Sequence, residues 1–276
     1  MIRLVALDLD GTALHSSGAF SPRTRRALEQ AVARGVHVVV ASGRPFRSLP
    51  DCLWQVEGLE YAVWSNGAAV SRLADGACLH RNCLPPEQVL AVLELLEPYP
   101  LAMEGAVDGV AYAAQAYVED PEAFGAPAAA VTYIRRTRQP VPDIRRFLWE
   151  NREGLEAVDV VVSDPSLKEK LREQLEGLGG LYVTSSVPHL LELASREAGK
   201  ASALAWLAEQ LSIGQEEIMA FGNAENDRDM IRFAGVGVVV ADSPESLQDA
   251  ADMVTAACDQ DGVAQTLEQW MQEGRM

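Results

Sequence analysis

Two aspartates, Asp8 and Asp10, follow a run of apolar residues directly and are themselves followed by Gly11 and Thr12. An apolar run of this length that ends at a glycine turn is typical of a buried strand in a parallel sheet. Ligands of open parallel sheets bind beyond the carboxyl ends of the strands. Two carboxylates so close together repel each other, so we expect a cation beside them, most simply Mg²⁺ with oxygen ligands. The alternative is an ordinary turn in which the aspartates cap backbone groups.

Polar residues also follow two other predicted strands. The apolar runs at residues 36–41 and 218–221 end in Ser42 and in a polar segment at residues 222–227. The carboxyl ends of parallel strands meet at one edge of a sheet, so residues more than 200 apart in the sequence can share one site. This convergence predicts a site better than any one of the segments does alone.

The elements that would position these residues alternate along the chain. Ser21 as N-cap and Pro22 at the first helical position open a helix after the first strand, and a βαβαβ pattern continues to residue 64. The middle of the chain differs, with a hairpin signal at Asp108-Gly109. We therefore predict an α/β protein with a doubly wound parallel sheet. Residues 1–82 and 191–276 form this core, and residues 83–190 form an inserted α+β domain.

The amino-acid composition and net charge argue against some classes of binding partner. The chain has 276 residues, of which 48% are hydrophobic, and a formal net charge of −17, so it can bury a large core and is unattractive to nucleic acid and anionic membranes. Its four cysteines show no CxxC spacing, and no stretch of about 18 apolar residues occurs. We expect a cytoplasmic protein with reduced thiols and without a nucleic-acid or membrane partner.

Taken together, the motifs resemble those of the haloacid dehalogenase superfamily of phosphohydrolases, and within it the Cof-type branch, whose inserted α+β domain is called the cap. The first and fourth motifs together are highly specific, and the resemblance extends over nearly the whole chain. The matching segments are DLDGT at residues 8–12, SGR at 42–44, Lys200 in EAGKASAL, GNAENDRDM at 222–230 and DGVA at 261–264.

The resemblance implies a role for each matching residue. Asp8 resembles the nucleophile that forms an aspartyl-phosphate, and Asp10 resembles the general acid and base. Lys200 resembles the cation that neutralises Asp8 and the phosphate. It opens a predicted helix, where the dipole disfavours a cation and a nearby anion would stabilise it. The residues that the resemblance assigns to the substrate phosphate are Gly11, Thr12, Ser42, Gly43, Arg44 and Asn226.

The metal implied by the resemblance is Mg²⁺, held by Asp8, Asp10, Asn223 and Asp227. Asn223 departs from the family, which usually has aspartate there as a direct ligand. An amide keeps the carbonyl oxygen but removes one negative charge, so we expect weaker metal binding. Asp227 could compensate directly or through water, or it could cap the helix that follows.

The implied activity is Mg²⁺-dependent hydrolysis of a small phosphorylated metabolite, such as a sugar phosphate or a phosphorylated cofactor, by a monomer or a homodimer. A phosphosugar mutase with the same phosphoenzyme is an alternative, and a catalytically weak phospho-ligand-binding protein is another, which Asn223 favours. The cap contains a run of five arginines, of which one or two could meet a second anion of the substrate; the alternative is a solvated face. They are Arg135, Arg136, Arg138, Arg145 and Arg146.

Overall fold

The computed structural model describes all 276 residues, which form two compact units. The first unit comprises Met1–Gly43, Leu49–His80 and Gly199–Met276. The second comprises Arg44–Ser48 and Arg81–Ala198 and is therefore inserted into the first. None of the helices has both the length and the apolar content that crossing a membrane requires. All four cysteines are free thiols.

The first unit is built on an eight-stranded sheet in which β1 is an interior strand. In spatial order the strands are β14 (Met253–Thr255), β13 (Val236–Val240), β12 (Ile218–Gly222), β1 (Leu4–Leu7), β2 (His37–Ala41), β3 (Tyr61–Trp64), β4 (Ala69–Arg72) and β5 (Cys78–Arg81). All pairs from β14 to β3 are parallel, and β4 runs antiparallel to β3. Every residue of β1 is buried, as its apolar sequence predicts.

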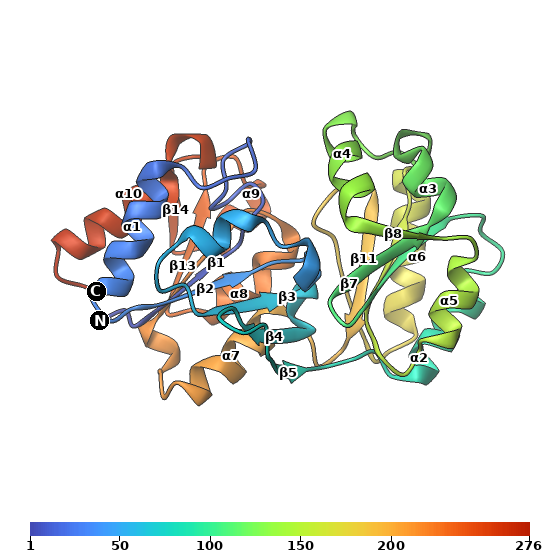
Figure 1. Cartoon of the computed structure of the whole chain (residues 1–276), viewed down its shortest axis with the longest axis horizontal. Coiled ribbons are helices and arrows are strands. Elements are labelled where there is room, and N and C mark those ends of the chain that lie inside the picture. Colours follow the sequence, from blue (N-terminus) through green and yellow to red (C-terminus); the bar gives the residue numbers. More distant parts are fainter. The chain divides into compact units, whose positions relative to one another are not determined.

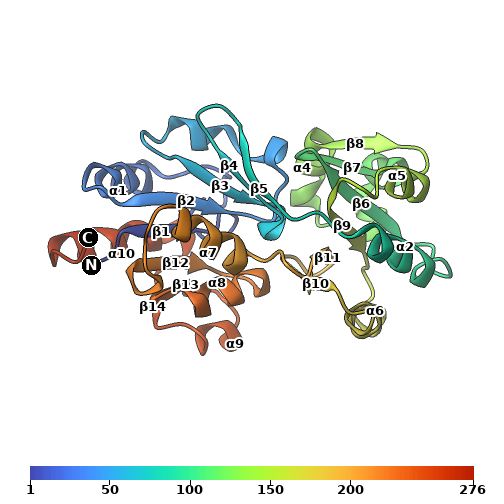
Figure 2. The ribbon, with the colours of Figure 1, turned by 90° about the horizontal axis from the view of Figure 1, so that it is seen from below.

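Helices cover both faces of this sheet, which confirms the predicted doubly wound core. One face packs against α7 (Lys200–Gln210), α8 (Arg228–Phe233) and α9 (Glu245–Gln248), which share an apolar cluster with β1 and β2 (Figure 2). The helices α1 (Pro22–Ala33) and α10 (Gly262–Gln272) pack against each other (Figure 1). Ser21 caps α1, because its side chain accepts a hydrogen bond from the backbone of Thr24.

The second unit is a six-stranded sheet with helices on both faces. In spatial order its strands are β10 (Leu181–Thr184), β11 (Leu190–Ser195), β9 (Leu155–Val161), β6 (Ala102–Val107), β7 (Val110–Ala114) and β8 (Arg138–Val141). One face carries α2 (Pro86–Leu95), α5 (Ile144–Glu150) and α6 (Pro165–Gly177). The other carries α3 (Gln115–Glu119) and α4 (Ala128–Thr137), which are neighbours in Figure 1.

One boundary of the inserted domain differs between the prediction and the structure. We expected the domain to end at residue 190, but β11 pairs with β10 and β9 and so belongs to the second sheet. The second unit consequently extends to Ala198, and the short segment Arg44–Ser48 joins it as well. The predicted hairpin at Asp108-Gly109 is present between β6 and β7, and both turn residues have positive φ.

Candidate active site

The sheet order brings the predicted site residues to one edge of the first unit. Asp8, Ser42 and Asn223 each follow the last residue of a strand, and these strands, β1, β2 and β12, are adjacent. The backbone N–H of Asp8 donates to the carbonyl of Phe221, which continues the ladder between β1 and β12 beyond its last pair. The first polar residue after β1 is thus held rigidly against the start of the 222–227 segment.

Lys200 lies at the centre of a buried charge cluster. Its Nζ donates to Asp8 Oδ1 at 2.8 Å and to Asp227 Oδ1 at 2.6 Å, and the lysine side chain has no exposed surface. Burial alone would lower the pKa of Lys200, but the two carboxylates raise it above its usual value. The lysine is therefore a fixed cation, although it is the first residue of α7, where the helix dipole disfavours positive charge.

Asp227 organises this cluster and does not face an opening. Its Oδ1 bonds Lys200, its Oδ2 accepts the backbone N–H groups of Asn223 and Ala224, and the residue is fully buried. Both oxygens thus accept hydrogen bonds from protein donors, and the role of Asp227 as a metal ligand stays a prediction. The expected side-chain cap of α8 is absent, since the carboxylate points back to the loop before it.

Asp8 keeps one carboxylate oxygen without a protein partner. Its Oδ1 bonds Lys200, whereas no protein group donates to Oδ2. Burial and then the repulsion by Asp227 raise the pKa of Asp8 to about 7, against the opposing effect of Lys200. Asp10 is exposed beside it and adds a smaller repulsion. A carboxylate in this position gains from any additional cation that reaches its open oxygen.

Gly11 allows the side chain of Asn223 to approach the backbone. Gly11 has a φ of +78°, and a Cβ atom there would overlap the Asn223 amide nitrogen. Thr12 Oγ1 donates to Asn223 Oδ1 at 3.1 Å. Gly11 and Thr12 therefore fix the orientation of the Asn223 amide, which is a structural role alongside the phosphate contact that the sequence predicts.

The oxygen donors at this edge fit a hard divalent cation. No three His, Cys, Asp or Glu side chains converge in a metal-binding arrangement, so a metal here has to use other oxygen atoms as well. Asp8 Oδ2 is available, Asn223 presents an amide oxygen, and Asp10 is exposed next to them. Aspartates outnumber the single buried lysine, and carboxylate and amide oxygens are the ligands that Mg²⁺ prefers.

Ser42 and Asn226 are linked through Asn66. The carbonyl of Ser42 accepts the Asn66 backbone N–H, and the Asn66 side-chain oxygen accepts a hydrogen bond from Asn226 Nδ2 at 2.9 Å. All three residues are buried, and Asn66 has a left-handed backbone, with a φ of +51°. The predicted phosphate-binding residues after β2 and β12 thus belong to one connected network.

Gly43 and Arg44 fall on different sides of the division between the units. Gly43 is the last residue of the first segment of the first unit, whereas Arg44 belongs to the second unit. There the Arg44 guanidinium donates to the carbonyl of Ser48 and lies 4.5 Å from the centre of the Tyr133 ring. The structure therefore does not place Arg44 in the buried cluster around Lys200.

Two residues that the sequence analysis did not single out support α7. Gly199 has a φ of +120°, and its N–H donates to the carbonyl of Asn66, which joins the start of α7 to the Ser42 network. Asp229 Oδ2 accepts the N–H of Ala201 in the first turn of α7. The sequence offered two signals for these roles. One is the glycine directly before Lys200, and the other is the aspartate two positions after Asp227.

The arginines of the second unit are mostly bound to the protein itself. Arg135 donates to the carbonyls of Val118 and Glu119, and Arg145 donates to three carbonyls between residues 93 and 99. Arg146 pairs with Glu150 on one exposed face of α5. These contacts leave little reason to assign the three arginines to a second anion of the substrate.

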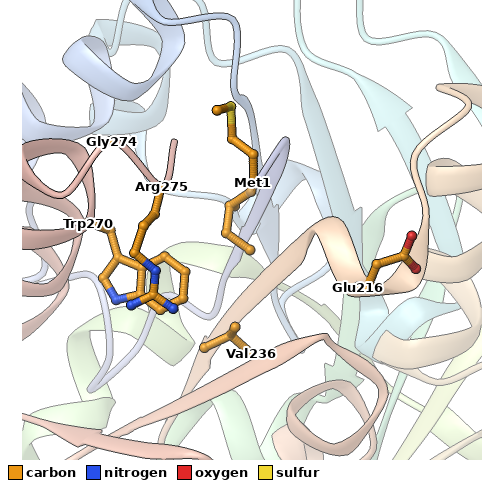
Figure 3. A pocket seen from close by; sticks show the side chains of 7 residues that line it. Met1, Glu216, Val236, Trp270, Gly274 and Arg275 are labelled. Carbon is orange, nitrogen blue, oxygen red and sulfur yellow. The ribbon is translucent and has the colours of Figure 1, made fainter.

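A pocket of about 390 Å³ lies at the opposite end of the first sheet. Met1 and Ile2 precede β1, Glu216 precedes β12, and Val236 is the first residue of β13, so this pocket lies at the amino ends of the strands. In Figure 3 the Arg275 guanidinium covers the Trp270 ring at the pocket wall. It contains none of the residues of the Lys200 cluster and is not the candidate active site.

Comparison with known proteins agrees with this geometry. Residues 5–267 match the family model of haloacid dehalogenase-like hydrolases. Phosphatase YwpJ of Bacillus subtilis (strain 168) is 30% identical over 279 residues, which cover 95% of this chain and 98% of that protein. A haloacid dehalogenase-like hydrolase from B. subtilis superposes with a TM-score of 0.86 at 28% identity, over 97% of this chain and 99% of that chain. The chain therefore belongs to the haloacid dehalogenase-like hydrolases, as its motifs at residues 8–12 and 222–230 predict.

Proposed function

We propose that this haloacid dehalogenase-type phosphatase hydrolyses a small phosphorylated metabolite through a phosphoryl group carried on Asp8. The observation that carries the proposal is the state of Asp8, whose Oδ1 is held by Lys200 while Oδ2 has no protein partner at the carboxyl end of the central strand. A carboxylate held in this way is oriented for attack, and the adjacent cation reduces its repulsion from a phosphate.

The steps use groups on one edge of the first sheet. A bond forms between an Asp8 oxygen and phosphorus while the bond from phosphorus to the leaving oxygen breaks, and Asp10 gives that oxygen a proton. Water then attacks phosphorus and loses a proton to Asp10, and the bond from Asp8 to phosphorus breaks to release phosphate. Asp10 is suited to both transfers because it is exposed, whereas Asp8 is buried.

The other residues bind and orient in this proposal. Lys200 neutralises charge on Asp8 and on the phosphoryl group, and Asp227 positions Lys200. Ser42 and Asn226, joined through Asn66, would supply polar contacts to the phosphate oxygens. The side chain of Asp8, the backbone of Asp10 and Asn223 would hold Mg²⁺, which supplies positive charge against the negative charge of substrate and nucleophile when it is bound.

The second unit would act as the cap that selects the substrate. Two further relatives, YcsE and YitU of Bacillus subtilis (strain 168), are named 5-amino-6-(5-phospho-D-ribitylamino)uracil phosphatases and are 24% and 26% identical to this chain. These names support a small organic phosphate as the substrate class, and sugar phosphates and phosphorylated cofactors both belong to it. Their identity to this chain is too low to carry the individual substrate over.

Phosphate release from para-nitrophenyl phosphate across a Mg²⁺ titration tests the proposal. We expect metal-dependent turnover in the wild type and its loss in Asp8→Asn, which keeps the shape of the side chain but removes the nucleophile. Asn223→Asp should lower the Mg²⁺ concentration needed for half-maximal rate by about tenfold, because it restores a charged ligand. Phosphate release that persists in Asp8→Asn would refute a covalent role for Asp8.

Two other outcomes of the same experiment would favour the alternatives. If the wild type releases no phosphate from this ester or from a panel of phosphorylated metabolites, the protein is better described as a phospho-ligand-binding protein. Asn223 would then explain the lack of turnover. If a phosphosugar isomer is converted to another without free phosphate, the protein is a mutase that uses the same phosphoenzyme.

A further inference from the structure

The turn after β3, which comprises Ser65, Asn66 and Gly67, has an unusual backbone. The φ angles of these three consecutive residues are +48°, +51° and +89°. Residues other than glycine rarely adopt this left-handed region, and here two of them do so in succession. Ser65 adds a second cost, because its hydroxyl is buried without a hydrogen-bond partner. A turn that is kept at such a cost indicates a role beyond the connection of two strands.

The backbone of Asn66 joins this turn to two other segments of the first unit. Its N–H donates to the carbonyl of Ser42 at 3.1 Å, and its carbonyl accepts the N–H of Gly199 at 3.1 Å. Ser42 directly follows β2, and Gly199 directly precedes Lys200. The directions of the N–H and the carbonyl depend on φ and ψ at Asn66, so both contacts depend on its left-handed conformation.

The side chain of Asn66 makes a third contact. Its Oδ1 accepts a hydrogen bond from Asn226 Nδ2 at 2.9 Å, and both residues are buried. An amide nitrogen carries two hydrogens, so this bond uses one of them and leaves the other for a phosphate oxygen. The bond also sets the orientation of the Asn226 amide, because the inverted amide would place its oxygen against Asn66 Oδ1.

These contacts complete a closed ring within the first unit. The residue after Asn226 is Asp227, and its Oδ1 accepts a hydrogen bond from Lys200 Nζ at 2.6 Å. Lys200 in turn follows Gly199, whose N–H returns to Asn66. Segments that are linked in a ring do not move independently of one another. The position of the Asn226 amide and the position of Lys200 are therefore coupled through Asn66.

We propose that Asn66 is a positioning residue of the phosphatase, whose side chain orients the Asn226 amide toward the phosphoryl group while its backbone fixes Ser42 and the start of α7. This inference rests on the proposed function and deepens it. Asparagine suits both tasks. It tolerates the left-handed backbone better than most residues, and its acceptor oxygen, unlike that of aspartate, brings no negative charge to a site for an anion.

A double-mutant cycle tests whether Asn66 acts through Asn226. The variants are Asn66→Gly, Asn226→Ala and the double variant. Glycine keeps the left-handed backbone, and with it the contacts to Ser42 and Gly199, and removes only the side chain. Titration calorimetry with inorganic phosphate, at one fixed Mg²⁺ concentration, measures Kd. We expect each single change to raise Kd about threefold to tenfold, as the loss of one hydrogen bond does, and the double variant to match Asn226→Ala within about twofold.

The kinetics of para-nitrophenyl phosphate hydrolysis provide a second readout. The contact from Asn226 acts on the bound ester and on the transition state alike. Asn66→Gly should therefore raise KM by about the same factor as Kd and leave kcat within about twofold of the wild type. A general loss of stability does not produce this pattern, because a smaller folded fraction lowers the rate at saturating substrate and leaves KM unchanged.

Ser212→Gly is the matched control. Ser212 also has a left-handed backbone, with a φ of +55°, but it is exposed and follows the end of α7 that is remote from Lys200. The change again replaces a polar left-handed residue with glycine, so it reproduces the effect on the backbone without removing a contact to Asn226. Its Kd for phosphate and its KM should equal those of the wild type.

Asn66 has no positioning role if Asn66→Gly binds phosphate as the wild type does, if the two single losses multiply in the double variant, or if Ser212→Gly weakens binding equally. The proposed function fails separately. A wild type that binds phosphate but hydrolyses no ester would refute that function, and the comparison of Kd values would still decide the role of Asn66. A wild type that neither binds phosphate nor hydrolyses an ester would refute both.

Discussion

Lys200 is the residue on which the buried cluster depends. It has two carboxylate partners, Asp8 and Asp227, and all three groups are buried. Replacing it with methionine keeps most of the side-chain volume and leaves the two buried carboxylates without their cation. Breaking a buried ion pair from one side typically costs about 3–5 kcal/mol, so we expect a loss of unfolding free energy of that size.

Urea denaturation of Lys200→Met measures this loss, and phosphate release should fall by several orders of magnitude. Lys170→Met is the control, because Lys170 is exposed and only approaches the ring of Tyr99. Its stability should change by less than about 0.5 kcal/mol. Equal stability of the two variants would mean that Asp8 and Asp227 share a proton in the folded protein and do not need the lysine.

For single residues, the sequence predicts well which residues gather at the site but predicts poorly which role each side chain has. Asp8 and Lys200 meet as the strand and helix pattern suggests. Asp227 reads as a possible ligand because it is an acid in a polar motif, but its two oxygens face Lys200 and the loop backbone. Side-chain direction within a motif depends on φ and ψ at each position, and residue types alone do not specify these angles.

Glu156 on β9 is an element-scale feature whose charge depends on pH. Burial raises its pKa to about 7, against the opposing effects of the Gly109 N–H and Arg81. In the unfolded chain a glutamate loses its proton near pH 4.3, so between that pH and about 7 the folded state binds a proton that the unfolded state does not. Stability from this group is full below pH 4 and decreases as pH rises to about 7.

Glu156→Gln should remove this dependence. The amide keeps an acceptor for Gly109, and above pH 7 the variant should gain about 3 kcal/mol over the wild type, with no gain at pH 4. Thermal unfolding midpoints of both proteins from pH 4 to pH 8 provide the comparison. A constant difference across that range would show that folding does not raise the pKa of Glu156.

The turn after β3 fixes the position of α7. Gly67 has a φ of +89°, and a Cβ atom at this position would overlap the backbone carbonyl of Gly199, the residue before Lys200. Gly67→Ala therefore has to move the start of α7. We expect the free energy of unfolding to fall by about 2 kcal/mol or more and phosphatase activity to fall strongly. Gly18→Ala has a similar φ of +80° but open space around it, so it isolates the cost of the backbone conformation. Urea denaturation compares the two, and equal losses would contradict the role of the contact with Gly199.

Elements with strong local signals were predictable, and those defined by tertiary pairing were not. The Ser21-Pro22 cap and the Asp108-Gly109 turn mark α1 and the β6–β7 hairpin in the sequence itself. β11 was assigned to the wrong domain because an apolar strand pattern does not say which sheet it joins.

The whole molecule carries a formal charge of −17, and its proposed substrate is an anion. Like charges slow their approach, and a rise from about 10 mM to 150 mM salt shortens the screening length from roughly 30 Å to 8 Å. The proposed site does not reverse this field over a long range, because its fixed cation, Lys200, is fully buried between two carboxylates. We therefore expect kcat/KM for para-nitrophenyl phosphate to rise several-fold with an inert monovalent salt.

The constant kcat should change little over the same range, since a buried cluster is screened less than the surface. Mg²⁺ has to be saturating at every salt concentration, because screening also weakens metal binding and would otherwise hide the effect. A fall in kcat/KM with salt would mean that exposed cations near the site attract the substrate. A rise in kcat/KM at constant kcat would instead show that the repulsion acts while enzyme and substrate approach each other. This is expected when the cation of the site is buried and does not attract the substrate from a distance.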